Sequence, residues 1–248
     1  MGNDTYEWNY NFSDLIDDHL KKESHPARIG VYWPSEIGAC IRMNYYKRFI
    51  PYEMPKEKLR LFRSGDAVHD FIREVLAKSD KVELLDWERS FKIPYDDFVY
   101  SGRLDDLILV RVAEEKMPVV VEVKSISGKT IEHIRHPNLP HLYQIHPYMY
   151  EIGARLGVIW YIARDTFVDR PFPIFYDESI MTEAFIRTKR LHLLLLEHTL
   201  PEPEARMNRD IFPCRTWRGW MCPYWHECRD DYNPCLEQGA ETSTYEQT

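Results

Sequence analysis

The 248-residue chain contains no apolar run that approaches the roughly 20 residues needed to cross a bilayer. Its first 20 residues also lack the basic and apolar blocks of a secretory signal. From these two absences we expect a cytoplasmic protein without membrane contact. Cysteine is scarce as well, with five residues, and an odd number argues against a framework of disulfides. The sequence carries no sign of the oligomeric state.

Apolar residues are plentiful: they make up 44% of the chain, enough for the core of one large domain. The net charge of -8 disfavours a polyanionic partner, but it arises at the two ends. Residues 1–20 hold five acids and no Lys or Arg, and residues 229–248 hold five acids and one Arg. The segment 42–63, by contrast, is basic and rich in tyrosine. Such a segment suits contact with a phosphate backbone, and a solvated basic helix face explains it equally well.

The apolar spacing predicts a mixed α/β domain. Helices are expected over 13–24, 35–49, 64–78, 137–153 and 179–198. Extended segments are expected over 82–93, 99–112, 118–125, 157–165 and 171–177, the first three as a meander. We divide the chain into an N-terminal appendage (1–34), a core (35–200) and a Cys-rich module with an acidic tail (201–248).

The most informative stretch is Tyr100–Ser125, which predicts two strands joined by a polar turn. Asp105 precedes one apolar run and Glu122 interrupts the next, and Lys124 shares a strand face with Glu122. Burying an unpaired carboxylate costs several kcal/mol, so these residues are expected to surround a cation. A hard divalent metal fits, and a structural Glu–Lys pair is the alternative. Alternation places Asp106 on the opposite face, which favours Asp105 as the ligand.

Several motifs then stand in a recognisable order. Gly102–Asp105 followed by Glu122–Lys124 resembles the core motif of the PD-(D/E)XK nuclease superfamily. Gly65–His69 resembles the upstream GxxxH of its RecB-like branch, and Gln144–Tyr148 resembles the QxxxY motif of that branch. The S-x4-C-x-R-x2-Y-Y segment around Cys40 is closest to the Cas-four-type CRISPR-associated exonucleases, and the cysteine layout is also similar to AddB-like iron–sulfur nucleases. The motifs span most of the chain.

This resemblance implies a restriction-endonuclease-like fold and a metal-dependent DNA exonuclease that acts on single strands or duplex ends. Lys124 would orient or deprotonate the attacking water, or steady the phosphate, while Gln144 and Tyr148 would position the lysine and the nucleic acid. The implied catalytic residues are Asp105, Glu122, Lys124, Gln144 and Tyr148. The implied ligands of Mg²⁺ or Mn²⁺ are His69, Asp105, Glu122 and the Val123 carbonyl. Without the resemblance, His69 would be interpreted as a packed helix-face histidine.

Four of the five cysteines lie within 22 residues near the C-terminus, a grouping typical of metal or cluster ligands. The family pattern is C-x2-C-x5-C; Cys222 and Cys228 match its second half, and Gly219 stands where the preceding cysteine is expected. The resemblance therefore leaves Cys214 and Cys235 as alternatives. We take Cys214, which keeps the chain order, and expect a structural [4Fe–4S] cluster on Cys40, Cys214, Cys222 and Cys228.

DNA is the expected partner, with contacts predicted from the basic segment: Arg42, Tyr45, Tyr46, Lys47 and Arg48. The chain has no P-loop GxxxxGK[ST], so unwinding would require a helicase, and a CRISPR integrase complex is a further partner class that the resemblance implies. CRISPR adaptation, recombinational repair and phage DNA processing all remain open. Two alternatives come from other classes: a catalytically silent DNA-binding or scaffolding subunit, and a zinc protein with an incidental α/β domain.

Overall fold

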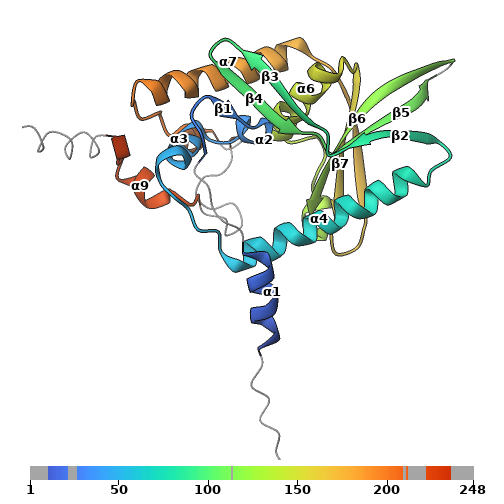
Figure 1. Ribbon diagram of the computed structural model, residues 1–248, viewed down its shortest axis with the longest axis horizontal. Coiled ribbons are helices and arrows are strands. Elements are labelled where there is room, and N and C mark those ends of the chain that lie inside the picture. Colours follow the sequence, from blue (N-terminus) through green and yellow to red (C-terminus); the bar gives the residue numbers. More distant parts are fainter. Residues whose placement is uncertain (1–10, 22–26, 113, 209–210, 212–221, 236–248) are drawn as a thin grey trace, which may run out of the picture.

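The computed structural model describes residues 11–21, 27–112, 114–208, 211 and 222–235, and two β-sheets form its frame. Within those residues the larger sheet has five strands, in the order β2-β5-β6-β7-β8 (Figure 1). β6 and β7 run parallel and the other neighbours run antiparallel, which makes the sheet mixed. The bounds are β2 Val82–Trp87, β5 Asp106–Val112, β6 Glu115–Ile126, β7 Leu156–Ala163 and β8 Asp169–Phe175.

The smaller sheet has the order β1-β4-β3, with β1 (Val31–Tyr32) parallel to β4 (Phe98–Arg103) and β3 (Ser90–Tyr95) antiparallel to it. Its inner face packs towards helix α7 (Glu178–Leu196). Tyr100 on β4 is fully buried there, and its hydroxyl donates to Thr188 Oγ1 over 2.6 Å. The sheet is therefore joined to α7 by a buried polar contact as well as by apolar packing.

Two helices cover the two faces of the larger sheet. On one face, α4 (Lys56–Ala77) packs Val68, Ile72 and Leu76 in the same cluster as the odd-numbered valines of β6. On the other face, α6 (Leu139–Ile152) approaches so closely that a Cβ at Gly157 would lie 2.9 Å from Ile145 Cδ1. Because both faces are buried, the centre of β6 is a continuous apolar run with Glu122 as its exception.

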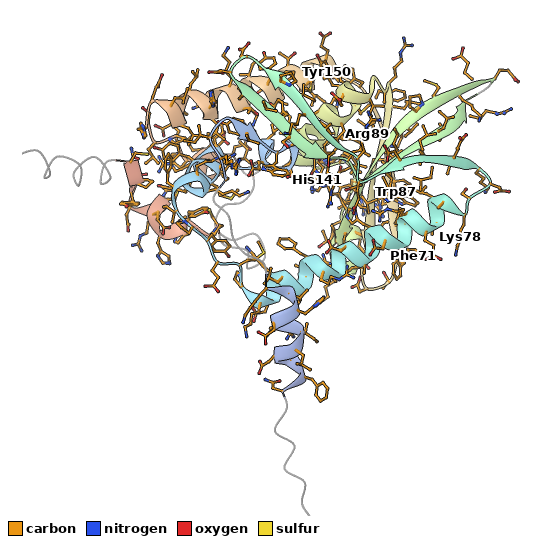
Figure 2. All side chains as sticks on the ribbon, in the orientation of Figure 1. Phe71, Lys78, Trp87, Arg89, His141 and Tyr150 are labelled. Carbon is orange, nitrogen blue, oxygen red and sulfur yellow. The ribbon has the colours of Figure 1, made fainter. Side chains whose placement is uncertain are left out.

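The remaining helices surround this frame. Helix α1 (Phe12–Leu20) is attached to α4 by ion pairs from the buried Asp17 to Lys56 (3.1 Å) and Arg60 (2.8 Å). Phe71 and Lys78, at the surface of α4 and just past its end, point outward (Figure 2). The bounds are α1 Phe12–Leu20, α2 Pro34–Ile37, α3 Ile41–Phe49, α5 Gly128–Ile131, α8 Glu204–Met207 and α9 Trp225–Arg229. Among the helices that the structure describes, none is long and apolar enough to span a membrane.

Several predicted elements are placed differently. The helix expected over 35–49 is divided into α2 and α3, and α4 begins eight residues before the predicted helix over 64–78. The pairing of the meander is confirmed, because the segment 82–93 pairs antiparallel with 99–112 and β5 pairs antiparallel with β6. Its first two segments are, however, divided between the two sheets, with β2 and β5 in the larger one and β3 and β4 in the smaller one. The chain turns between β2 and β3 at Glu88, whose φ is 47°, and Leu104 donates to the Arg89 carbonyl where β4 ends. β1 pairs with β4 although it lies in the predicted appendage 1–34.

Candidate active site

The site lies where β5 separates from β6. The two strands pair only as far as Asp106 and Val121, whereas β6 continues to Ile126 alongside β7. Past that point the Val123 N–H donates to Asp105 Oδ2 over 2.8 Å, so a side chain takes the place of the missing strand. The N–H and C=O of one strand residue point to the same side, so the Val123 carbonyl faces the same gap.

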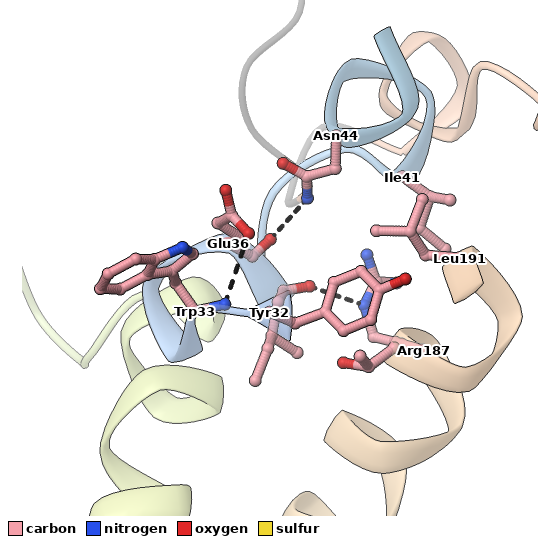
Figure 3. A pocket seen from close by; sticks show the side chains of 9 residues that line it. Tyr32, Trp33, Glu36, Ile41, Asn44, Arg187 and Leu191 are labelled. Carbon is pink, nitrogen blue, oxygen red and sulfur yellow. Dashed lines mark hydrogen bonds between the residues drawn. The ribbon is translucent and has the colours of Figure 1, made fainter. Parts of the chain in front are cut away.

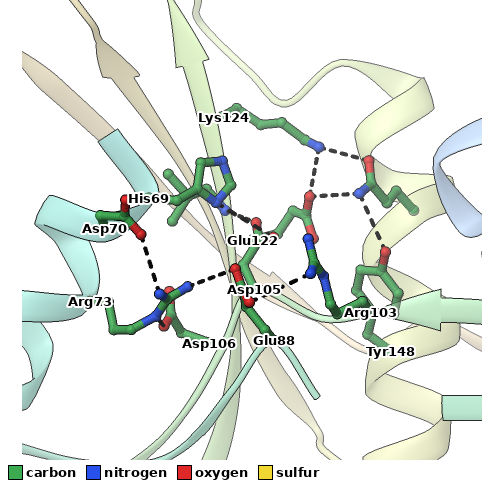
Figure 4. A network of polar contacts seen from close by, with 12 residues as sticks. His69, Asp70, Arg73, Glu88, Arg103, Asp105, Asp106, Glu122, Lys124 and Tyr148 are labelled. Carbon is green, nitrogen blue, oxygen red and sulfur yellow. Dashed lines mark hydrogen bonds and ion pairs between the residues drawn. The ribbon is translucent and has the colours of Figure 1, made fainter. Parts of the chain in front are cut away.

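A second group of contacts joins β6 to α6 through Glu122 (Figure 4). Lys124 Nζ donates to Glu122 Oε1 over 2.6 Å and to Gln144 Oε1 over 2.7 Å. Gln144 Nε2 in turn donates to Glu122 Oε1 over 2.7 Å and lies 3.4 Å from Tyr148 Oη. Residues four apart on a helix share a face, which is why Gln144 and Tyr148 point to the same carboxylate. The lysine and the amide are thus held in a closed triangle with Glu122.

His69 reaches the same place from α4, on the other side of the sheet. Its Nδ1 lies 3.5 Å from Asp105 Oδ1, and its side chain is 29% exposed. Burial lowers its pKa, so the ring is neutral at neutral pH and can act as a donor to a metal. The structure therefore brings together all of the predicted catalytic and metal-binding side chains.

The electrostatics of the site favour a cation. Burial raises the pKa of Asp105 to about 6, and burial together with the nearby Asp105 raises that of Glu122 to about 7. Glu122 Oε2 is buried and accepts no hydrogen bond from any described residue. Two hard carboxylates, a neutral imidazole and an unpaired buried oxygen match the donor set that Mg²⁺ or Mn²⁺ takes. Across the described part of the chain, however, no group of three or more His, Cys, Asp or Glu side chains already has metal-binding geometry. At this site Lys124 forms an ion pair with the other oxygen of Glu122.

The sequence did not predict a neighbouring ion pair between Asp106 and Arg73. Asp106 is 1% exposed and faces α4, on the side of the sheet that alternation predicts. Arg73 Nε lies 3.7 Å from Asp106 Oδ1 and its Nη2 lies 3.2 Å from Glu88. Burial raises the pKa of Asp106 to about 6. Arg73 follows His69 by one helical turn, and that spacing was the available signal that it would face the same strands.

The cysteines that the structure describes lie on the far side of α3. Cys40, Cys222 and Cys228 line one pocket together with Met43 and Trp225. The predicted fourth ligand, Cys214, lies outside the described residues. Cys235 does not line this pocket, and its Sγ lies 3.1 Å from Tyr45 Oη.

The predicted DNA contacts on α3 need correction. Four of the five side chains are buried and bonded within the protein: Arg42, Tyr45, Tyr46 and Arg48. Arg42 donates to the Pro201 carbonyl, and Tyr46 Oη donates to the Tyr232 carbonyl over 2.9 Å. Lys47 alone is exposed, and it pairs with Glu36. A side chain that is already enclosed and bonded cannot offer its charge to a phosphate, so the prediction is wrong for these four.

The fold and the site define a mixed α/β architecture in which a forked sheet, flanked by helices, presents acids and a lysine at the fork.

The chain matches no family model and no curated protein. Among solved structures it is similar to SSO0001, with 17% identity and a TM-score of 0.52 over 84% of this chain and 98% of that one. It is also similar to LHK-Exo in complex with dAMP, with 15% identity and a TM-score of 0.50 over 69% and 91%. A second structure, of the alkaline exonuclease LHK-Exo from Laribacter hongkongensis, aligns with 14% identity and a TM-score of 0.47 over 68% and 90%. At such identities the similarity shows a shared fold.

Proposed function

We propose that the protein is a metal-dependent deoxyribonuclease that hydrolyses phosphodiester bonds as an exonuclease, on single-stranded DNA or at duplex ends. One observation carries this proposal: Glu122 keeps a buried, unpaired oxygen between Asp105 and the lysine–glutamine pair of Lys124 and Gln144. The fold that the chain shares with an exonuclease supports the same conclusion.

Each residue has a role that follows from its position. Asp105, Glu122, His69 and the Val123 carbonyl would hold Mg²⁺ or Mn²⁺, which supplies charge neutralisation at the phosphoryl oxygens and a more acidic water. Lys124 Nζ donates two of its hydrogen bonds to Glu122 and Gln144, so its third N–H can donate to a water or to a phosphoryl oxygen.

We further propose a structural [4Fe–4S] cluster at the pocket of Cys40, Cys222 and Cys228, with Cys214 as the fourth ligand. The placement of Cys235 beside Tyr45 supports Cys214 over Cys235. A cluster there would join α3 to the C-terminal segment, at a point that the candidate active site does not use. A role in trimming DNA ends, in CRISPR adaptation, recombination or phage DNA processing, fits such a nuclease.

Cleavage of single strands labelled at the 5′ or the 3′ end tests the activity, with Mn²⁺ and with EDTA. Lys124→Ala is expected to lower the rate by about 10²- to 10⁴-fold, the usual effect of losing one catalytic group. Lys116→Ala is the matched control, because Lys116 lies on the same strand and makes an exposed pair with Glu83. Absence of cleavage by the unaltered protein with every metal would instead favour a silent scaffolding subunit.

A further inference from the structure

The outer face of the smaller sheet is polar and open. Along β3, Phe91 and Ile93 are buried, whereas Ser90 and Lys92 point to the other side and are exposed. The register places Lys92 opposite Ser101 and Ser90 opposite Arg103. Strand alternation therefore gathers hydroxyls and cations on one side of a sheet whose other side is apolar.

Trp33 stands at the edge of this face. It directly follows β1, and it is 48% exposed whereas its neighbour Tyr32 is 1% exposed. Figure 3 shows its indole directed away from the Tyr32 and Asn44 side of α2. Because β1 is parallel to β4 with Tyr32 opposite Tyr100, the next residue along, Trp33, comes level with Ser101. A large aromatic ring is thus presented to solvent in the same row as Ser101 and Lys92.

Two adjoining hollows cover this face. One, of about 770 Å³, extends from Trp33 to Arg103. The other, of about 540 Å³, extends from Trp33 to Arg28 and Lys47. Both are lined by Trp33, Lys92 and Ser101, so they meet at these residues, and we call the two together the Trp33 groove.

The charge of the groove is opposite to that of the whole chain. Four cations line it: Arg28, Lys47, Lys92 and Arg103. The acid among the lining residues is Glu36, which is buried and already pairs with Lys47 and Arg48. Glu88 lies 3.5 Å from Arg103 in an exposed contact. Lys92 is exposed at the centre of the groove.

The Arg103 end of the groove lies near the candidate active site. Arg103 is two residues before Asp105, and it lies beside Tyr148 and Glu122 in Figure 4. Phe91, beneath the groove, points to the buried side of the sheet and packs there edge-on against Tyr148, with ring centroids 5.1 Å apart. A chain that passes around Arg103 at the end of the groove therefore comes next to the fork between β5 and β6.

We propose that the Trp33 groove binds single-stranded DNA, with a base stacked on Trp33 and phosphates at Lys92 and Arg103, and leads the strand to the site at Glu122. An aromatic platform between cations is the arrangement by which proteins hold unpaired strands, because every base has a face that can stack. A duplex cannot offer such a face except at its end. This inference rests on the proposed function, whose substrate it specifies.

Binding measured in EDTA tests the groove separately from cleavage. Fluorescence anisotropy with a labelled oligothymidylate probe is expected to show about 5- to 150-fold weaker binding for Trp33→Ala, and recovery of most of that loss in Trp33→Phe. Lys92→Ala is expected to reduce the slope of log K against log salt by roughly 0.7, the value for one contact on a single strand. Phe175→Ala and Lys116→Ala are the matched controls, since both side chains are exposed outside the groove.

The outcomes separate the two proposals. Unchanged affinity in Trp33→Ala, with the unaltered protein still cleaving DNA, overturns the groove and leaves the nuclease. Weaker binding in Trp33→Ala, with no cleavage under any metal, supports the groove and overturns the nuclease. An equal loss of affinity for a blunt duplex of the same length overturns the assignment to single strands. Thermal unfolding of each variant confirms that the fold is intact.

Discussion

Replacing Glu122 by Gln tests whether the buried site is built for a cation. The pKa of this carboxyl is raised from 4.5 to about 7, chiefly by burial and then by Asp105. An acid whose folded pKa is raised stabilises the fold below its unfolded pKa, and this stability is lost as the pH rises through the folded value. At pH 8 the ionised carboxylate therefore costs on the order of 3 kcal/mol, because one pKa unit is about 1.36 kcal/mol.

Glutamine keeps the shape and an acceptor for Lys124 but cannot ionise. In EDTA at pH 8 the Glu122→Gln protein is thus expected to melt higher than the unaltered protein, by roughly 6–12 °C at about 2–4 °C per kcal/mol. At pH 4.5 the difference in melting temperature between the two proteins should nearly vanish. Mn²⁺ at about 1,000 times its Kd should reverse the order at pH 8, since it stabilises the unaltered protein by about 4.1 kcal/mol and the variant has lost a ligand.

Circular dichroism melting in EDTA and in Mn²⁺, at both pH values, measures all four conditions. Glu83→Gln is the control for loss of an exposed acid, because Glu83 makes a surface pair with Lys116. The reasoning would be refuted if Glu122→Gln melted below the unaltered protein in EDTA at pH 8, and if Mn²⁺ raised the melting temperatures of both proteins by the same amount.

Two further predictions concern other parts of the molecule. Cys228→Ser, purified without oxygen, is expected to lose the visible absorption of an iron–sulfur cluster and to melt lower; a variant that keeps colour, fold and activity would disprove the cluster assignment. The pKa of His141 is lowered to about 3, by burial and then by Lys124. The stability that the neutral His141 ring contributes to the fold is therefore present above pH 6.5 and is lost as the pH falls towards 3. Urea unfolding measures the free energy of unfolding at pH 7 and at pH 5. Between these pH values His141→Gln should lose about 1 kcal/mol less of that free energy than the unaltered protein, a value discounted because the ring is partly exposed. Equal losses would contradict it.

The strand that carries Glu122 and Lys124 could be predicted from the sequence because strand periodicity is local. A spacing of two puts both side chains on one face whatever the rest of the fold does, and the structure places them 2.6 Å apart. Alternation likewise placed Asp106 on the face opposite Glu122, towards Arg73 of α4. It did not separate Asp105 from that helix, because Asp105 lies just before β5 and reaches His69. His69 and Gln144 could be assigned only by resemblance, since their positions depend on how α4 and α6 pack on opposite faces of the sheet.

The division of the strands into two sheets could not be predicted from the sequence. The segments 82–93 and 99–112 are each divided between two sheets, and in each the division falls at a short turn inside an extended run. At Glu88 a positive φ bends the chain without any Gly or Pro, while the antiparallel register continues from Trp87 opposite Asp106 to Ser90 opposite Arg103. Propensity indicates that such residues are extended, but it cannot indicate where a long hairpin bends from one sheet into another. The meander therefore predicted the pairing of the three segments and missed the division of the first two between sheets.

The basic segment on α3 shows why charge counts mislead about partners. Arg42 and Tyr46 find their acceptors in residues 201 and 232, more than 150 positions away, so composition within 42–63 gives no warning of them. Their bonds hold the C-terminal segment against α3, and that segment brings Cys222 and Cys228 to Cys40. We conclude that these cations and tyrosines assemble the cysteine pocket. In the proposed Trp33 groove, by contrast, the strand alternation of β3 and β4, and not local charge density, decides that Lys92 and Arg103 reach solvent.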